Sequence, residues 1–225
     1  MSKQVLVWDL PLRIFHWSFA ASIIGCWVTH ELGSDYIDWH MQLGYVAMGL
    51  LLFRVLWGFI GTKHARFASF FPTPGKIRHY LANSDEKHVG HNPLGSLMVF
   101  TMLLLVLVQV SSGLFVDDEI FTTGPYFNAL GGEVDSLMNT LHHNAFDFIA
   151  VAIVLHVIAV IFYQRVKKHN LVKPMITGKK NSNDMKEVDA IAGSRLLLAI
   201  VLGLLCAGFV YWLVVINAPV VEEFY

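Results

Sequence analysis

The chain has 225 residues, of which 55% are apolar and only 15% are charged, and its formal net charge is −1. Because a typical soluble domain has about 25% charged residues, this composition indicates an integral membrane protein. The near-neutral charge gives no reason to expect a nucleic-acid partner. Cys26 and Cys206 lie in apolar runs outside any C-x-x-C pattern, which argues against an iron–sulfur cluster, a structural zinc site and covalently attached c-type haem.

Five apolar runs are long enough to be helices that cross a bilayer, which needs roughly 20 residues. The first run follows Lys3 and Arg13 and has no small-residue cleavage site after it, so we expect a retained helix rather than a signal peptide. Since backbone groups inside a bilayer must be bonded internally, each run should be an α-helix. The predicted spans are residues 14–30, 39–60, 94–116, 141–163 and 196–216.

The loops between these runs alternate in charge. Loops 31–38 and 117–140 are acidic and contain no Lys or Arg, and 15 of the 16 Lys and Arg residues lie in or beside the N-terminal segment and the second and fourth loops. The positive-inside rule places the basic segments in the cytoplasm. We therefore expect a multi-pass protein of the bacterial inner membrane with a cytoplasmic N-terminus and a periplasmic C-terminus.

Histidines inside the predicted spans need an explanation, because ionisable groups are costly there. A lone histidine is usually interfacial or hydrogen-bonded, but these form a pattern. His142 and His156 are 14 residues apart on one helix, which places them on one face with about 21 Å of rise between them, whereas the neighbouring His143 is turned away. Together with His16 and His40, they offer four imidazoles to one bundle interior.

The directions of the helices sort these four histidines into two pairs. His40 and His142 lie towards the periplasm, and His16 and His156 lie towards the cytoplasm. Such pairs suit bis-imidazole ligation of two b-type haems. Zinc is a weaker alternative, since each site gathers two ligands and no thiolate. For His16 and His156 to meet, the first span must begin earlier than residue 14 or the fourth helix must project into the cytoplasm, and we expect both.

Arg54 is the one basic residue inside a predicted span. It follows His40 by 14 residues and so shares its face at cytoplasmic depth. A buried guanidinium needs an anion, and a haem propionate is a natural partner. The alternative is that the side chain snorkels to the cytoplasmic interface.

Five stretches of sequence carry a resemblance to the bacterial cytochrome b561 / nickel–iron hydrogenase b-type cytochrome family. Together they cover about residues 5–168. They are VWDLPLRIFHW (7–17), WHMQLGY (39–45), Arg54 followed by WGFIG (57–61), GHNPLG (90–95), and the His142 to His156 spacing. The resemblance implies an all-α four-helix dihaem bundle that exchanges electrons with quinone.

The family's ligand pattern falls on His16, His40, His142 and His156, the four residues already singled out. A fifth helix is found in only part of the family. We therefore expect a dihaem cytochrome b bundle at 1–168, a cytoplasmic linker at 169–193, and an additional transmembrane helix with a periplasmic tail at 194–225.

The quinone pocket of related dihaem subunits lies near the cytoplasmic haem. The candidates here are His91 and Asn92, where the third span begins. The alternative for Asn92 is a helix cap before Pro93, and the two roles do not exclude each other.

These features predict a membrane carrier of electrons between quinone and a periplasmic c-type cytochrome or hydrogenase, which would dock on acidic loops 31–38 and 117–140. The residues fit either direction of electron flow and allow an oligomer within the membrane lipid. One alternative is periplasmic superoxide oxidation coupled to quinone reduction, which the acidic loops disfavour because steering follows charge. Another is a non-redox anchor or transporter, which no broken-helix or inverted-repeat signal supports.

Overall fold

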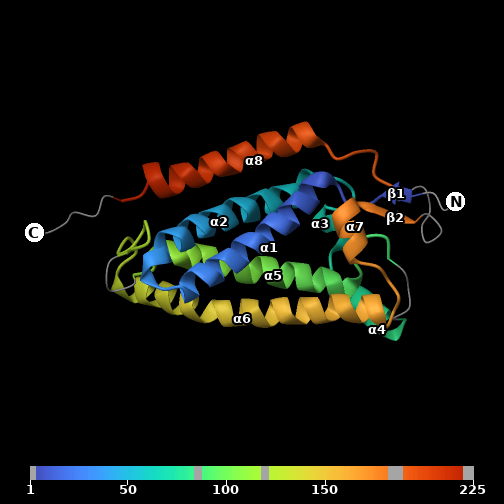
Figure 1. The fold of residues 1–225 in the computed structure, drawn as a ribbon, viewed down its shortest axis with the longest axis horizontal. Helices are drawn as coiled ribbons and strands as arrows, with labels where there is room; N and C mark the ends of the chain where they lie inside the picture. Colours follow the sequence, from blue (N-terminus) through green and yellow to red (C-terminus); the bar gives the residue numbers. More distant parts are fainter. Residues whose placement is uncertain (1–3, 84–87, 118–121, 182–189, 220–225) are drawn as a thin grey trace, which may run out of the picture.

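A bundle of four long helices forms the body of the protein. The computed structural model describes residues 4–83, 88–117, 122–181 and 190–219. The bundle helices are α1 (Leu10–Glu31), α2 (Ile37–Ile60), α5 (Pro93–Ser112) and α6 (Gly132–Arg165). Helix α1 packs against α2, α2 against α5, and α5 against α6. Successive long helices run in opposite directions (Figure 1).

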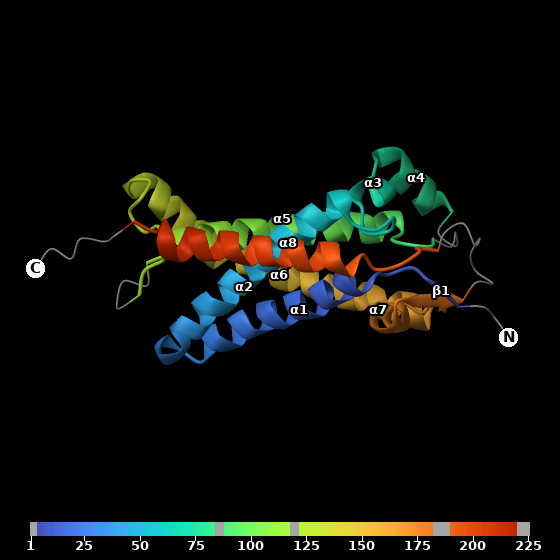
Figure 2. The ribbon, with the colours of Figure 1, turned by 90° about the horizontal axis from the view of Figure 1, so that it is seen from above.

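A fifth long helix lies outside this bundle. It is α8 (Leu196–Tyr211), which continues into a π-helical segment, η5 (Trp212–Ile216). Helix α8 packs mainly on α2 and touches α1. It lies along one side of the bundle in Figure 1 and crosses in front of the bundle in the view from above in Figure 2. The additional helix predicted at residues 196–216 is thus present as a separate element.

Four helical segments in the described part of the chain are long and apolar enough to cross a membrane. They are Ser34–Ile60, Pro93–Phe115, Gly132–Arg165 and Leu196–Ile216. Helix α1 is not among them, because Arg13, His16, His30 and Glu31 lower its hydropathy. The structure therefore supports four of the five predicted spans by length and composition, and the first span stays a prediction.

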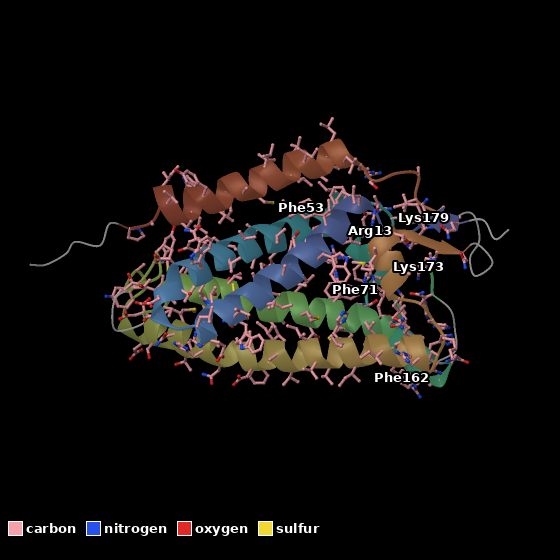
Figure 3. The ribbon with its side chains drawn as sticks, in the orientation of Figure 1. Arg13, Phe53, Phe71, Phe162, Lys173 and Lys179 are labelled. Atoms are coloured by element: carbon pink, nitrogen blue, oxygen red, sulfur yellow. The ribbon has the colours of Figure 1, made fainter. Side chains whose placement is uncertain are left out.

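The ends of the bundle have different structures. The N-terminal end carries the small elements β1 (Gln4–Leu6), α3 (Phe67–Phe70), α4 (Pro74–Ala82), α7 (Val172–Thr177) and β2 (Lys179–Asn181) (Figure 1). Arg13, Lys173 and Lys179 lie together at this end (Figure 3). The C-terminal end carries η1 (Ser34–Tyr36), η2 (Gly113–Phe115) and the end of α8. The basic segments thus gather at one end, as the charge pattern requires.

The expected linker at 169–193 contains a short helix and a strand in the part that the structure describes, residues 169–181 and 190–193. Its strand β2 pairs antiparallel with β1, with Val5 opposite Lys180, and the amides of Val7 and Trp8 donate to the Gly178 carbonyl at 2.8 and 3.1 Å. Gly178 has φ +81°, which favours glycine, and a Cβ there would lie 2.7 Å from the Trp8 carbonyl oxygen. The described residues are therefore mostly helical, and they include a small two-stranded sheet that the all-α prediction did not include.

A buried carboxylate fixes the start of α1. Asp9 is fully buried, and its Oδ1 accepts a hydrogen bond from the Leu12 amide at 2.7 Å, which caps the helix. Its Oδ2 accepts from Trp57 Nε1 at 3.2 Å and from the Thr62 hydroxyl. One side chain therefore joins the start of α1 to the end of α2, at the N-terminal end of the bundle.

Replacing Asp9 tests this connection. We expect Asp9→Ala to lower the free energy of unfolding by about 2 kcal/mol or more, because the cap is lost and two buried donors are left without an acceptor. Denaturant unfolding in detergent micelles measures the change. The exposed Asp35→Ala is the matched control and should change it by less than about 0.5 kcal/mol. Equal losses in the two variants would contradict the role of Asp9.

Candidate functional site

The first histidine pair lies towards the N-terminal end of the bundle. His16 on α1 faces His156 on α6, with ring centroids 6.4 Å apart and ring planes at 53°. The Nδ1 atom of His16 is buried and has no hydrogen-bond partner. Helix α1 begins at Leu10, four residues before the predicted span, and α6 continues to Arg165. The earlier start of the first helix is therefore present, and the projection of α6 into the cytoplasm stays a prediction.

The second pair lies towards the C-terminal end. His40 on α2 faces His142 on α6, with ring centroids 6.1 Å apart and ring planes at 83°. His40 Nδ1 donates to the Cys26 carbonyl at 2.9 Å, and His142 Nδ1 donates to the Gln109 carbonyl at 3.0 Å. A metal-ligating histidine commonly donates its second ring N–H in this way, which fixes the ring and leaves Nε2 for the metal.

The separations within both pairs fit one metal ion between two imidazoles. A metal–nitrogen bond is about 2 Å long, and adding about 1 Å from nitrogen to ring centre on each side gives centroids about 6 Å apart. The observed values are 6.4 and 6.1 Å. The two rings of each pair are too far apart to bond each other, and their separation is the one that a metal held by both would give.

Each candidate site offers two histidine ligands to a metal. In the described residues, no group of three or more His, Cys, Asp or Glu side chains could hold a metal. A bare ion with two imidazoles would lack most of its ligands, which disfavours zinc. A macrocycle that brings its own four nitrogens needs two axial ligands and no more, so the pairs fit a haem.

Two glycines leave space at the second pair. A Cβ on Gly113 would lie 2.8 Å from Cε1 of His142, so only glycine lets η2 approach the ring this closely. Gly44 lies one turn beyond His40, and a Cβ there would meet nothing within 4 Å. The sequence analysis missed Gly113 as part of the site, because a glycine after an apolar run reads only as a helix end.

Gln109 is a second residue of this site that the sequence analysis missed. Its backbone carbonyl holds His142, and its side-chain amide nitrogen lies 3.3 and 3.4 Å from the two ring nitrogens. Because Nδ1 of His142 already donates to the Gln109 carbonyl, the side-chain amide can donate to Nε2, at 3.4 Å. The sequence signal that could have identified Gln109 is a polar side chain within an otherwise apolar helix.

Arg54 is buried, with only 2% of its surface exposed. Its guanidinium lies over the Phe67 ring at 4.6 Å and near the Phe70 ring at 5.9 Å. The buried Nη1 atom has no hydrogen-bond partner. The side chain does not reach solvent, which argues against snorkelling, and its free donor can take an anion.

His91 lines two adjoining cavities at the N-terminal end, of about 250 and 240 Å³. Its ring lies between Trp8 and Phe70, with centroid distances of 4.8 and 4.5 Å. Burial and then the nearby charge of Arg54 lower the pKa of His91 to about 3, so the ring is neutral at physiological pH. The buried Nδ1 has no hydrogen-bond partner.

Asn92 has a different position from His91. It does not line either cavity; its Oδ1 accepts from the Gly95 amide at 2.7 Å and caps α5, ahead of Pro93. Its Nδ2 donates to the Tyr80 hydroxyl at 3.3 Å, which lies 2.8 Å from the Tyr163 hydroxyl. The helix-cap alternative for Asn92 is thus what the structure shows.

The fold and these sites define a helical membrane protein with two internal pairs of facing histidines. The chain belongs to the prokaryotic cytochrome b561 family, whose model matches residues 7–178. Membership of this b-type cytochrome family implies haem b as the cofactor and electron transfer in a membrane. The match ends just after α7 and leaves out α8.

Several curated proteins are similar to the chain over most of its length. It is 27% identical over 215 residues to a probable Ni/Fe-hydrogenase B-type cytochrome subunit of Azotobacter chroococcum mcd 1, across 80% of this chain and 90% of that protein. It is 28% identical over 215 residues to a protein of the same description from Bradyrhizobium diazoefficiens, across 80% of this chain and 87% of that protein. No solved structure matches the chain significantly.

Proposed function

We propose that the chain is a dihaem cytochrome b that carries electrons between quinone and a hydrogenase. The observation that carries this proposal is the pair of facing histidines at each end of the bundle, with ring centroids 6.4 and 6.1 Å apart. His16 and His156 would be the axial ligands of one haem b, and His40 and His142 those of the other. A haem b held by two imidazoles supplies one-electron transfer without an open position for a substrate.

The described contacts support these roles residue by residue. The carbonyls of Cys26 and Gln109 orient His40 and His142 through Nδ1, so that Nε2 of each ring would hold the metal. At His142 the side-chain amide of Gln109, which lies 3.4 Å from Nε2, would give way to it. Arg54 offers its free Nη1 to a propionate of the haem held by His16 and His156. The buried Asp9 carboxylate already interacts electrostatically with Arg54, and a propionate would add a hydrogen-bonded anion at the free Nη1.

In this proposal all five long helices cross the bacterial inner membrane. Helix α1 has 22 residues, or about 33 Å of rise, which matches the hydrocarbon core. It packs along α2, which is long and apolar enough to span by itself. The basic N-terminal end of the bundle would face the cytoplasm, and the C-terminal end would face the periplasm.

The periplasmic partner is proposed to be a hydrogenase rather than a c-type cytochrome. The relatives covered over most of their length are described as Ni/Fe-hydrogenase B-type cytochrome subunits. The partner would dock at the C-terminal end of the bundle, beside His40 and His142. The loops there are acidic, which favours a partner with a basic contact surface.

Quinone is proposed to bind in the cavities lined by His91. The ring is neutral, and its free Nδ1 can accept a hydrogen bond from a quinol hydroxyl. The cavities and the pair of His16 and His156 lie at the same end of the bundle, the N-terminal end. Asn92 would act indirectly, by starting α5 at the correct place for His91.

Single histidine variants test the pairing. We expect a potentiometric titration of the wild-type haem absorbance to show two components. His40→Ala and His142→Ala should both lose one of them, and His16→Ala and His156→Ala should both lose the other, because removing either axial ligand empties that site.

The exposed His79→Ala is the control for this series and should retain both components. Loss of the same component in His40→Ala and His156→Ala would show that the pairs are wrong. Retention of both components in all four ligand variants would refute the assignment of these residues as ligands.

The quinone pocket is tested by His91→Leu. We expect the rate of haem reduction by a soluble quinol analogue to fall about tenfold or more, since a hydrogen bond to the substrate is lost. Reduction by dithionite and the haem content should stay as in the wild type. Stopped-flow absorbance measures both rates. His169→Leu is the control, and equal quinol rates in His91→Leu and the wild type would remove the pocket from this place.

A further inference from the structure

The end of α8 is hydrogen-bonded to the loop that joins α5 to α6. The hydroxyl of Tyr126 donates to the Leu213 carbonyl at 2.9 Å, and Nδ2 of Asn217 donates to the Tyr126 oxygen at 3.0 Å. Leu213 lies in the π-helical segment Trp212–Ile216. Carbonyls at a helix end lack partners within the helix, so Tyr126 satisfies one that α8 leaves free.

Tyr126 also belongs to a tight turn around η2. Its amide donates to the Leu114 carbonyl at 2.8 Å, and the Gly124 amide donates to the Val116 carbonyl at 2.7 Å. A Cβ on Gly124 would lie 2.5 Å from the Leu114 carbonyl oxygen, so glycine is required for this approach. The rings of Tyr126 and Phe115 lie 6.0 Å apart. The turn therefore positions η2 relative to Tyr126.

The segment η2 in turn contacts the ring of His142. Its first residue, Gly113, lies so close that an added Cβ would come 2.8 Å from Cε1 and 3.0 Å from Nδ1. The amide of Gly113 donates to the carbonyl of Gln109, and Nδ1 of His142 donates to the same carbonyl. The orientation of His142 is thus set by the end of α5 and by η2 together.

We propose that α8 is a brace for the haem site of His40 and His142, and that Tyr126 is the positioning residue through which it acts. The connection runs from the Leu213 carbonyl through Tyr126 and η2 to Gly113 and His142. Helix α8 also packs along α2, which carries His40, and Val210 of α8 lies 3.8 Å from the Cβ position of Gly49. Helix α8 thus contacts the turn that packs on His142 through η2, and it contacts the helix that carries His40. The proposal rests on the ligand roles proposed above.

Tyr126→Phe is the direct test, because it removes two hydrogen bonds and keeps the ring that packs on Phe115. We expect the midpoint potential and the electron paramagnetic resonance signal of one haem to shift, namely the haem that His142→Ala loses. The other haem should keep its wild-type values. Asn217→Ala should shift the same haem by a smaller amount, since it removes one of the two bonds.

The matched control is Tyr211→Phe, at the exposed Tyr211 near the same end of α8. It should leave both haems unchanged. If the wild type shows two haem components and Tyr126→Phe changes neither or changes both equally, the brace is refuted while the dihaem assignment stands. A wild type without two components would instead overturn the proposed function.

A second readout does not need the haem. In the haem-free protein, Tyr126→Phe should increase amide hydrogen exchange at Gly124 and Tyr126, whose bonds to η2 lose their anchor on α8. Tyr211→Phe should leave these amides as protected as in the wild type. Wild-type protection in Tyr126→Phe would contradict the connection from α8 to η2.

Discussion

Two pairs of imidazoles that face each other inside a helical bundle are the arrangement on which the rest of the structure depends. Polar rings in an apolar interior are costly unless their nitrogens have partners. At the C-terminal end, one nitrogen of each ring donates to a backbone carbonyl, and the centroids of the two rings lie 6.1 Å apart. The helix lengths, the close approach of Gly113 and the burial of Arg54 all serve this arrangement.

The two ends of the bundle surround their histidine pairs by different means. At the N-terminal end, buried charge dominates: Asp9 joins α1 to α2, Arg54 is buried beside aromatic rings, and His91 lines cavities that suit a polar ring substrate. At the C-terminal end, backbone hydrogen bonds dominate, and Tyr126 links α8 to η2. The quinone site proposed at the N-terminal end and the partner site proposed at the C-terminal end would thus have different surroundings.

Much of this could be predicted from the sequence. Hydropathy and the charge of the loops predicted the long helices, and helix direction together with the 14-residue spacing predicted which histidines face each other. Both patterns are local in the sequence, so they can be recognised without knowledge of how the helices pack. Helix α1 was less clear, because its polar residues lower the hydropathy that reveals a span.

The remaining features depend on contacts between distant residues. From the sequence alone, Gly113 indicates only a helix end, and its contact with His142 is visible only in the structure. In the same way, Tyr126 indicates only an aromatic residue in a loop, and its hydrogen bond to the end of α8 is visible only in the structure. The sheet between β1 and β2 joins residues that the chain separates by four long helices, and strands of three residues leave little pattern. Asn92 differs from these residues, because the local sequence Asn92-Pro93 was sufficient to predict its role as a helix cap.

The central claim is that each of the two histidine pairs holds one haem b. A pyridine haemochrome assay on the purified chain, with protein quantified by amino-acid analysis, measures this most directly. The account predicts two haems b per chain, both low-spin with two axial imidazoles. One haem per chain would contradict the assignment of one pair, and a chain without haem would contradict the account as a whole.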